Sequence, residues 1–183
     1  MKTLNRTTLL VLFAAITVHA HAQLYSTKEG KVDFYSKTPV ENIEAHSSKA
    51  LAVLNASTKE MAFSVANVSF EFPNKLMQEH FNEKYMESEK YATSSFKGKI
   101  SEAVDLTKDG SYEITVTGKL NVHGVEQART IAGKLTVKEG AIHLLSDFQI
   151  RVADHKIEIP TLVLAKIAEE INVHVDAVLY PKK

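Results

Sequence analysis

Long runs in which apolar and polar residues alternate are the feature that most constrains the fold of this 183-residue chain. The clearest run has one apolar face, formed by Ile142, Leu144, Phe148, Ile150 and Val152. Successive side chains of a strand point to opposite faces, so each such run predicts a strand with one buried face. Residues 112–122 and 171–180 alternate in the same way, and weaker alternation predicts strands around 32–35, 50–54, 61–72, 96–106 and 131–137.

Short turns separate these runs. Lys108-Asp109-Gly110 and Lys138-Glu139-Gly140 place glycine where a hairpin turn favours positive φ, and His123-Gly124 follows the run 112–122. About eight strands joined by short turns predict an all-β fold, an antiparallel sheet closed into a barrel or folded into a sandwich. We expect a single domain over residues 23–183, because no linker or internal repeat interrupts the pattern.

Two segments depart from the strand pattern. Pro73 opens the first, which runs to about Met86 and carries apolar residues at helical spacing. Pro160 opens the second, with apolar residues at intervals of two to four as far as Ile171. Proline suits the first turn of a helix, where its missing N–H would be unpaired anyway. The sequence therefore predicts two short helices beside the sheet.

The first 22 residues resemble a secretory signal peptide. Lys2 and Arg6 precede an apolar run over residues 9–18, and Ala20-His21-Ala22 matches a cleavage site of small residues. This pattern predicts cleavage between Ala22 and Gln23, and a mature protein that is soluble and either periplasmic or secreted. The apolar run is too short for an ordinary membrane-spanning helix.

Composition and missing motifs exclude several classes of function. The 22 acidic residues balance the 22 lysines and arginines, which gives no electrostatic reason to expect nucleic acid as a partner. The chain has no cysteine, so disulfides, thiolate metal sites and a cysteine nucleophile are all excluded. Neither a Gly-x-Ser-x-Gly nucleophile motif nor a glycine-rich phosphate loop is present. We therefore expect a binding protein without a cofactor rather than an enzyme.

The densest group of polar, potentially functional side chains lies in the first helical segment. An apolar stripe is formed there by Met77, Phe81 and Tyr85, and an acidic column by Glu79, Glu83 and Glu87. His80 lies beside the stripe, but the second histidine of a zinc hydrolase motif is missing. One hypothesis is a metal-dependent enzyme that uses His80 with Glu79 or Glu83. The other is a solvated acidic face beside a histidine that bonds a backbone carbonyl.

A second polar pair, His174 and Asp176, lies on one face of the last predicted strand. Residues two apart on a strand share a face, so these two side chains are candidates for direct contact or for a shared ligand. The alternative is an ordinary polar pair on the outside of the sheet.

Small residues interrupt the apolar rows that are expected to face inward. They are Gly118, Gly133, Ser146 and Ala177. The interior of an eight-stranded barrel is just wide enough to be filled by side chains or to hold one slender ligand. The sequence thus leaves open both a narrow apolar tunnel for an alkyl or isoprenoid chain and a ligand-free structural or stress-protective barrel with a solid core.

Taken together, these segments resemble the YceI-like family of exported bacterial proteins. The resemblance runs from Lys31-Val-Asp-Phe to Val173-His-Val, and its most specific part is Leu76-Met77, His80-Phe81 and the following residues to Gly98. Gly118-Lys-Leu-Asn-Val-His-Gly124-Val is similar to a family hairpin, and the segment 154–160 to a sub-branch with an added crossover. Ala92 departs from the pattern, because the family usually has proline there.

The resemblance implies a lipocalin-like barrel that holds a polyisoprenoid or isoprenoid-quinone-like chain for transport, storage or stress protection. The residues expected to line the site are Met77, Phe81, Tyr85, Val116, Phe148, Ile150, Val173 and Val175. His80 is the candidate contact to a ligand head group. A transient contact with a membrane and a homodimer are also expectations at this stage.

Overall fold

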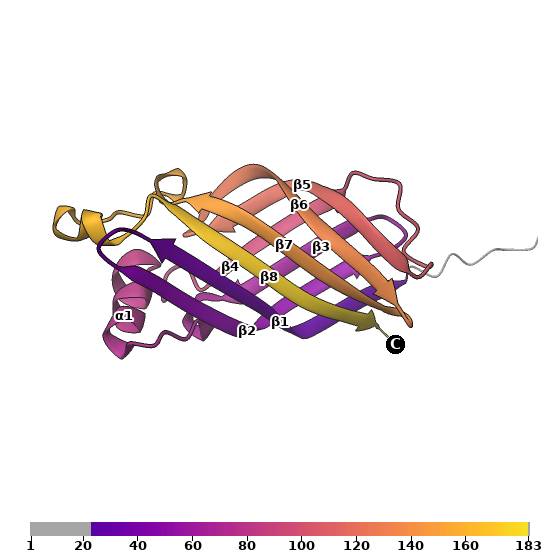
Figure 1. Ribbon diagram of the computed structural model, residues 1–183, viewed down its shortest axis with the longest axis horizontal. Helices are drawn as coiled ribbons and strands as arrows, with labels where there is room; N and C mark the ends of the chain where they lie inside the picture. The colour runs from indigo at the N-terminus through magenta and orange to yellow at the C-terminus, as the bar shows by residue number, and fades with distance from the viewer. Residues whose placement is uncertain (1–22, 183) are drawn as a thin grey trace, which may run out of the picture.

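The computed structural model describes residues 23–182, and these form a closed barrel of eight strands (Figure 1). The strands are β1 (Leu24–Lys37), β2 (Asn42–Asn55), β3 (Glu60–Ala66), β4 (Thr93–Ile100), β5 (Gly110–Val122), β6 (Val125–Lys138), β7 (Ala141–Arg151) and β8 (Glu170–Pro181). Each strand pairs antiparallel with the next, and β8 pairs with β1 to close the barrel. The predicted all-β barrel is confirmed. The predicted signal peptide, residues 1–22, lies outside the described residues.

Two strands end earlier than the alternation predicts. β3 stops at Ala66 because the short 3₁₀ helix η1 (Asn67–Ser69) turns the chain there. Asn67 is fully buried, and its side-chain amide donates to the Tyr91 carbonyl at 2.6 Å, which fixes the turn. β4 stops at Ile100, so the predicted extension to Leu106 is wrong. Leu106 is buried instead as part of the loop that follows.

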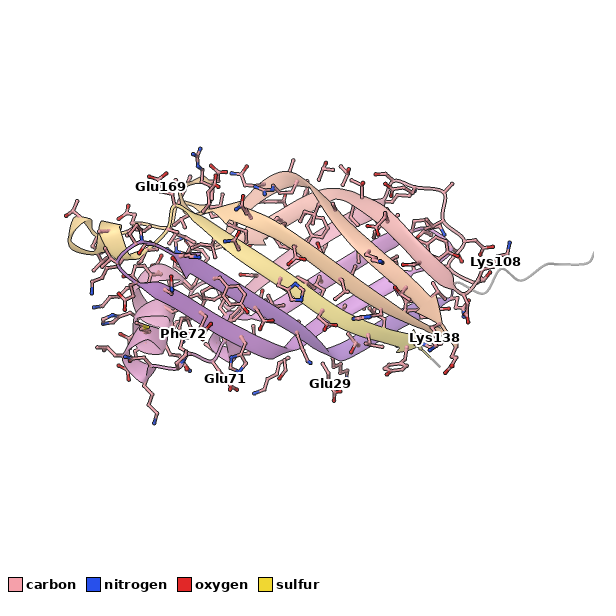
Figure 2. All side chains as sticks on the ribbon, in the orientation of Figure 1. Glu29, Glu71, Phe72, Lys108, Lys138 and Glu169 are labelled. Atoms are coloured by element: carbon pink, nitrogen blue, oxygen red, sulfur yellow. The ribbon has the colours of Figure 1, made fainter. Side chains whose placement is uncertain are left out.

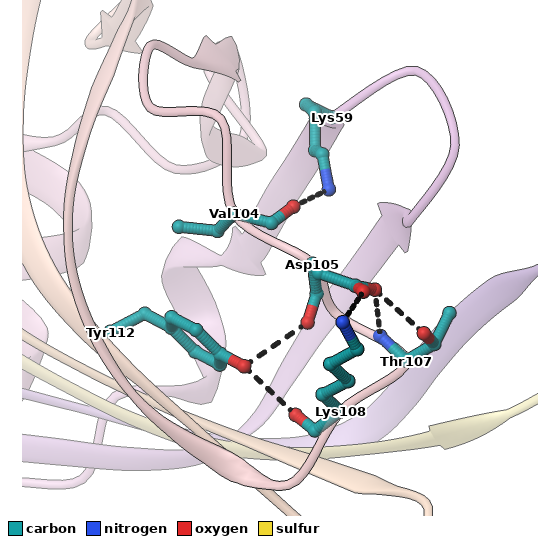
Figure 3. A network of polar contacts seen from close by, with 6 residues as sticks. All are labelled: Lys59, Val104, Asp105, Thr107, Lys108 and Tyr112. Atoms are coloured by element: carbon teal, nitrogen blue, oxygen red, sulfur yellow. Dashed lines mark hydrogen bonds and ion pairs between the residues drawn. The ribbon is translucent and has the colours of Figure 1, made fainter.

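Large side chains fill one end of the barrel, which we call the closed end. Its interior holds Tyr25, Leu54, Leu135, Ile142 and Leu179, each no more than 2% exposed. The loop 101–109 covers this end and inserts Leu106 into the same core. Figure 3 shows how the loop is held: the Tyr112 hydroxyl donates to the carbonyls of Asp105 and Lys108, and Lys59 donates to Val104. Hydrogen bonds from Thr107 lower the pKa of Asp105 to about 2.

Helical segments gather at the opposite end, which we call the mouth (Figure 1). Helix α1 (Lys75–His80) begins after Asn74, whose side-chain oxygen accepts from the N–H groups of Leu76 and Met77. It continues into a widened π-helical turn, η2 (Phe81–Tyr85), so the first predicted helix is present with looser winding at its end. Figure 2 places Phe72 and Glu169 at this end and Lys108 and Lys138 at the other.

The second predicted helix is shorter than expected. The mouth carries two 3₁₀ segments here, η3 (Val152–His155) and η4 (Thr161–Lys166), and helical structure does not reach Ile171. Glu170 and Ile171 already belong to β8, where they pair with Arg151 and Ile150 of β7. The strand ladder thus overrides the helical spacing of the apolar residues.

Candidate ligand-binding cavity

A cavity of about 510 Å³ lies inside the mouth half of the barrel. Its wall is formed by residues of all eight strands, with α1, η2 and η4 at the mouth. Its inner limit is set by Met61, Ile114 and Leu144, which also belong to the core of the closed end. The barrel is therefore solid over one half and hollow over the other.

The sequence-predicted site residues come together on this wall. All of them line the cavity: Met77, His80, Phe81, Tyr85, Val116, Phe148, Ile150, Val173 and Val175. Val116, Val173 and Val175 are buried, whereas Phe148, Ile150 and Phe81 are partly exposed. That these side chains contact a ligand stays a prediction, because the structure contains none.

Four phenylalanines pack around the mouth, and three of them were missed by the sequence analysis. Phe81 of η2 stacks on Phe34 of β1 with ring centroids 5.4 Å apart. Phe70 and Phe72 meet Phe81 at 5.7 and 5.1 Å, and Phe34 meets both of them edge-on. Aromatic pairs at such distances contribute about 0.5–1.5 kcal/mol beyond their buried area. The cluster holds η2 against the barrel. In the sequence, the spacing of two between Val32 and Phe34 and between Phe70 and Phe72 indicated that these side chains share an inward face.

Several polar groups on the cavity wall are already bonded within the protein. Asn67 accepts from the Ser94 hydroxyl at 2.8 Å, Ser146 donates to the Ala132 carbonyl at 2.7 Å, and Ser36 accepts from the Ala168 N–H at 2.8 Å. The wall therefore offers little to a polar ligand group. Such a wall favours hydrocarbon, since an unpaired polar group buried there would be unfavourable.

The mouth carries one ion pair on the cavity wall, within the part of the chain that is described. Lys166 Nζ of η4 lies 3.5 Å from Glu41 Oε2, which belongs to the turn between β1 and β2. This pair links η4 across the mouth and leaves neither charge unpartnered. His80 also reaches the wall, is partly exposed and has no hydrogen-bond partner among residues 23–182.

The small residues predicted to hollow the barrel have different roles. Gly133 and Ser146 do line the cavity. Gly118 instead permits the close approach of β4 and β5, because a Cβ built there would lie 2.1 Å from the Lys97 carbonyl oxygen. Ala177 packs in the closed-end core. The sequence left open a hollow apolar tunnel and a solid core, and the barrel has a cavity in its mouth half and a solid core in its closed half.

The polar pair expected on the last strand is replaced by two others. His174 contacts Asp147 of β7 at 2.7 Å, and Asp176 contacts His143 of β7 at 2.7 Å. The reason is cross-strand register, since His174 lies directly opposite Asp147. No group of three histidine, aspartate or glutamate side chains arranged to hold a metal occurs in the described part of the chain.

A buried histidine pair joins three segments near the mouth. His123 lies 2.8 Å from Glu87 and donates from Nδ1 to the His155 carbonyl at 3.2 Å. Tyr91 packs edge-on against the His123 ring. His155 in turn donates from Nδ1 to the Val125 carbonyl at 3.1 Å, and its buried Nε2 has no hydrogen-bond partner among residues 23–182. Burial lowers the pKa of His155. Glu87 is thus not part of a purely solvated acidic face.

A closed antiparallel barrel with one solid end and one hollow, apolar end defines a lipocalin-like protein. The family follows from the sequence: the family model of the YceI-like domain matches residues 14–179, and the chain belongs to that family. No protein with a curated description matches the chain in sequence. No helix within residues 23–182 combines the length and apolar character needed to cross a membrane.

Solved structures share the fold. A polyisoprenoid binding domain from Saccharophagus degradans, implicated in plant cell wall breakdown, superposes with a TM-score of 0.75 at 14% identity, covering 88% of this chain and 100% of its own. BcnA of Burkholderia cenocepacia gives 0.69 at 16% identity, covering 82% and 95%. The YceI protein of Campylobacter jejuni gives 0.59 at 14% identity, covering 100% of both chains. At these identities the likeness shows the fold alone.

Proposed function

We propose that this protein binds a long apolar chain of the polyisoprenoid or isoprenoid-quinone type in the cavity of the barrel. The observation that carries the proposal is the largely apolar wall of the 510 Å³ cavity, on which several of the polar groups are already bonded within the protein. The similar domain from Saccharophagus degradans, which is described as polyisoprenoid binding, supports the same ligand class.

The energetics of such binding follow from buried hydrocarbon. Each buried CH₂ contributes about 0.8 kcal/mol, so a dozen buried groups contribute roughly 10 kcal/mol before any cost. Association then costs several kcal/mol in lost motion of the ligand. A flexible prenyl chain is therefore expected to bind with a Kd of about micromolar or tighter.

The shape of the cavity determines the orientation of the ligand. The closed end is filled by large side chains, so the apolar end of the chain points toward Met61 and Ile114. The polar head then stays at the mouth, near His80 and the Glu41–Lys166 pair. The His80 ring lies on the wall there and has no hydrogen-bond partner among the described residues, which makes it the candidate head-group contact.

The physiological part of the proposal extends the sequence expectations. The signal peptide directs the protein to the periplasm or outside the cell, where the barrel carries or stores its ligand or protects it under stress. Transient contact of the barrel with a membrane gives access to such a ligand. Leu76 and Val40, which are exposed at the mouth, are suited to that contact. A homodimer is compatible with this role.

Native mass spectrometry of protein purified gently from its exporting cells tests the proposal. A discrete added mass that extracts into organic solvent as a prenyl lipid or quinone is the expected result. The purified protein is then titrated with geranylgeraniol, a prenyl alcohol. A protein that carries no lipid and gives no saturable binding would overturn the proposed function.

A further inference from the structure

The wall of the barrel changes character between β6 and β7. The two strands share a backbone ladder only near the closed end, where Lys134–Lys138 pair with Ala141–Leu145. Beyond it, residues 125–133 of β6 pair with β5, and residues 146–151 of β7 pair with β8. We call the stretch between these two segments the β6–β7 seam. Both strands can be followed in Figure 1 from their hairpin toward the mouth.

Side chains bridge the seam in place of the ladder. Four side-chain hydrogen bonds to backbone carbonyls span the gap. Two join the strands themselves, from Ser146 to Ala132 at 2.7 Å and from Arg129 to Gln149 at 2.5 Å. Two join β6 to η3, which follows β7: Gln127 donates to Asp154 at 2.8 Å, and His155 donates to Val125 at 3.1 Å. Gln127 and Arg129 occupy positions of β6 that alternate with its exposed residues, where a purely apolar barrel would carry hydrophobic side chains. Gln127 and Arg129 are polar at these positions because their side chains form the hydrogen bonds that leave β6 on this side.

An interruption between β2 and β3 is closed differently. The ladder between β2 and β3 covers Leu51–Leu54 and Met61–Ser64. Above it, the backbone groups of His46 and Glu71 bond to each other in both directions, at 3.1 and 2.8 Å. Backbone pairing therefore resumes beside β2, whereas across the β6–β7 seam only side chains make the connection among the hydrogen bonds of the described residues.

The cavity reaches this seam from inside. Ile131, Ala132 and Gly133 of β6 line it on one side, and Ser146, Phe148 and Ile150 of β7 on the other. Ala132 points to the outer surface and is exposed, yet it belongs to the cavity lining. The seam therefore borders the cavity along its inner side.

We propose that the β6–β7 seam is a lateral portal through which the apolar ligand enters and leaves the barrel. The proposal rests on the proposed function, because it concerns the route to the same cavity. Parting the seam breaks the side-chain hydrogen bonds that span it, whereas the adjoining backbone ladders remain intact. At the mouth, by contrast, the packed rings of Phe34, Phe70, Phe72 and Phe81 hold η2 against the barrel.

A reversible disulfide across the seam tests the portal. A Cβ built on Gly133 lies 3.5 Å from the Cβ of Ser146, which suits a disulfide, and the chain has no cysteine of its own. The Leu145 carbonyl oxygen lies 3.0 Å from the same Cβ, so a shift of a few tenths of an ångström is needed. The variant is Gly133→Cys with Ser146→Cys. The matched control is Ser47→Cys with Ser69→Cys, whose hydroxyl oxygens lie 2.7 Å apart and which locks β2 to η1.

The measurement is the rate at which diphenylhexatriene, a fluorescent hydrocarbon, passes from the protein to phosphatidylcholine vesicles. We expect the oxidised seam variant to transfer the probe at least about tenfold more slowly than its reduced form, because the opening motion is blocked. The oxidised control should transfer at the rate of its reduced form. Equal rates for the oxidised and reduced seam variant, or slowing only in the control, would overturn the portal.

A second variant keeps the test decisive if the seam disulfide does not form. Replacing Gln127 and Arg129 with alanine removes two of the four side-chain hydrogen bonds and should raise the transfer rate several-fold. An unchanged rate in that variant would contradict the portal. If the wild-type protein takes up no probe at all, the proposed function fails instead, so the two failures are distinguishable.

Discussion

The substitution Val116→Thr offers a sharp test of the cavity as the binding site. Val116 of β5 is 5% exposed, lies on the cavity wall and pairs with Ile100 and Ile131 on the neighbouring strands. Threonine has nearly the same shape as valine, so the packing of β5 is preserved. The change replaces one methyl group on the cavity wall with a hydroxyl group.

The magnitude of the effect follows from hydration. In the unoccupied cavity the new hydroxyl can keep a water molecule, whereas an apolar chain displaces that water and supplies no hydrogen-bond partner. The neighbouring backbone groups are already used in the β4–β5 and β5–β6 ladders. An unpaired buried hydroxyl costs about 1–3 kcal/mol by mutational data, which weakens binding by roughly 5- to 150-fold.

Titration with geranylgeraniol, together with thermal unfolding, measures both affinity and stability of the variant. The matched control is Thr117→Val, the reverse exchange on the neighbouring residue, which faces outward and bonds only Thr130 at 3.2 Å. The control should bind like the wild type. If Val116→Thr unfolds normally and still binds within about twofold of the wild type, Val116 does not contact the ligand and the site must lie elsewhere.

Three further predictions concern single residues. Gly118→Ala should destabilise the barrel by about 1–3 kcal/mol, because the added Cβ would lie 2.1 Å from the Lys97 carbonyl oxygen; thermal unfolding measures the loss. Burial lowers the pKa of His155, so the unfolding free energy should be constant above the ordinary histidine pKa of 6.5 and fall as the pH drops below it. Denaturant titrations at pH 5 and 8 should show this loss, and His155→Phe should remove it. His80→Ala should weaken geranylgeraniol binding by no more than about tenfold, because one hydrogen bond to the head contributes about 0.5–1.5 kcal/mol while the tail supplies most of the affinity. An unchanged affinity in the same titration would show that His80 does not contact the head group.

Much of the fold could be predicted because strand alternation is a local property. Residues such as Val173, Val175 and Phe148 are two apart along a strand or directly opposite across one pair, so period two alone places them on one face. Hairpin turns then restrict the order of the strands. The same local rule explains why the predicted wall residues of the strands lie on the cavity wall, whereas Met77 and Phe81 reach it from the helical segment at the mouth.

Features that depend on register or on distant loops could not be predicted in this way. The partners of His174 and Asp176 are decided by which β7 residues lie opposite them. The π-helical turn after His80 depends on Phe81 packing against Phe34, some fifty positions earlier in the chain. Neither contact leaves a periodic trace in the sequence.

The division of the barrel into a solid and a hollow half shows the same limit more clearly. Along β5, Ile114 and Val116 line the cavity, whereas Tyr112, two residues earlier, reaches out to the loop 101–109. The alternation of apolar and polar residues does not indicate where along β5 the cavity wall ends and the closed end begins. At the closed end, large strand residues such as Tyr25 and Leu135 meet Leu106 of that loop in one core, whereas at the mouth the chain adds α1, η2 and η4 around a cavity. A filled end and a hollow end thus share one strand pattern, and the size of the inward side chains together with the loop at each end distinguishes them.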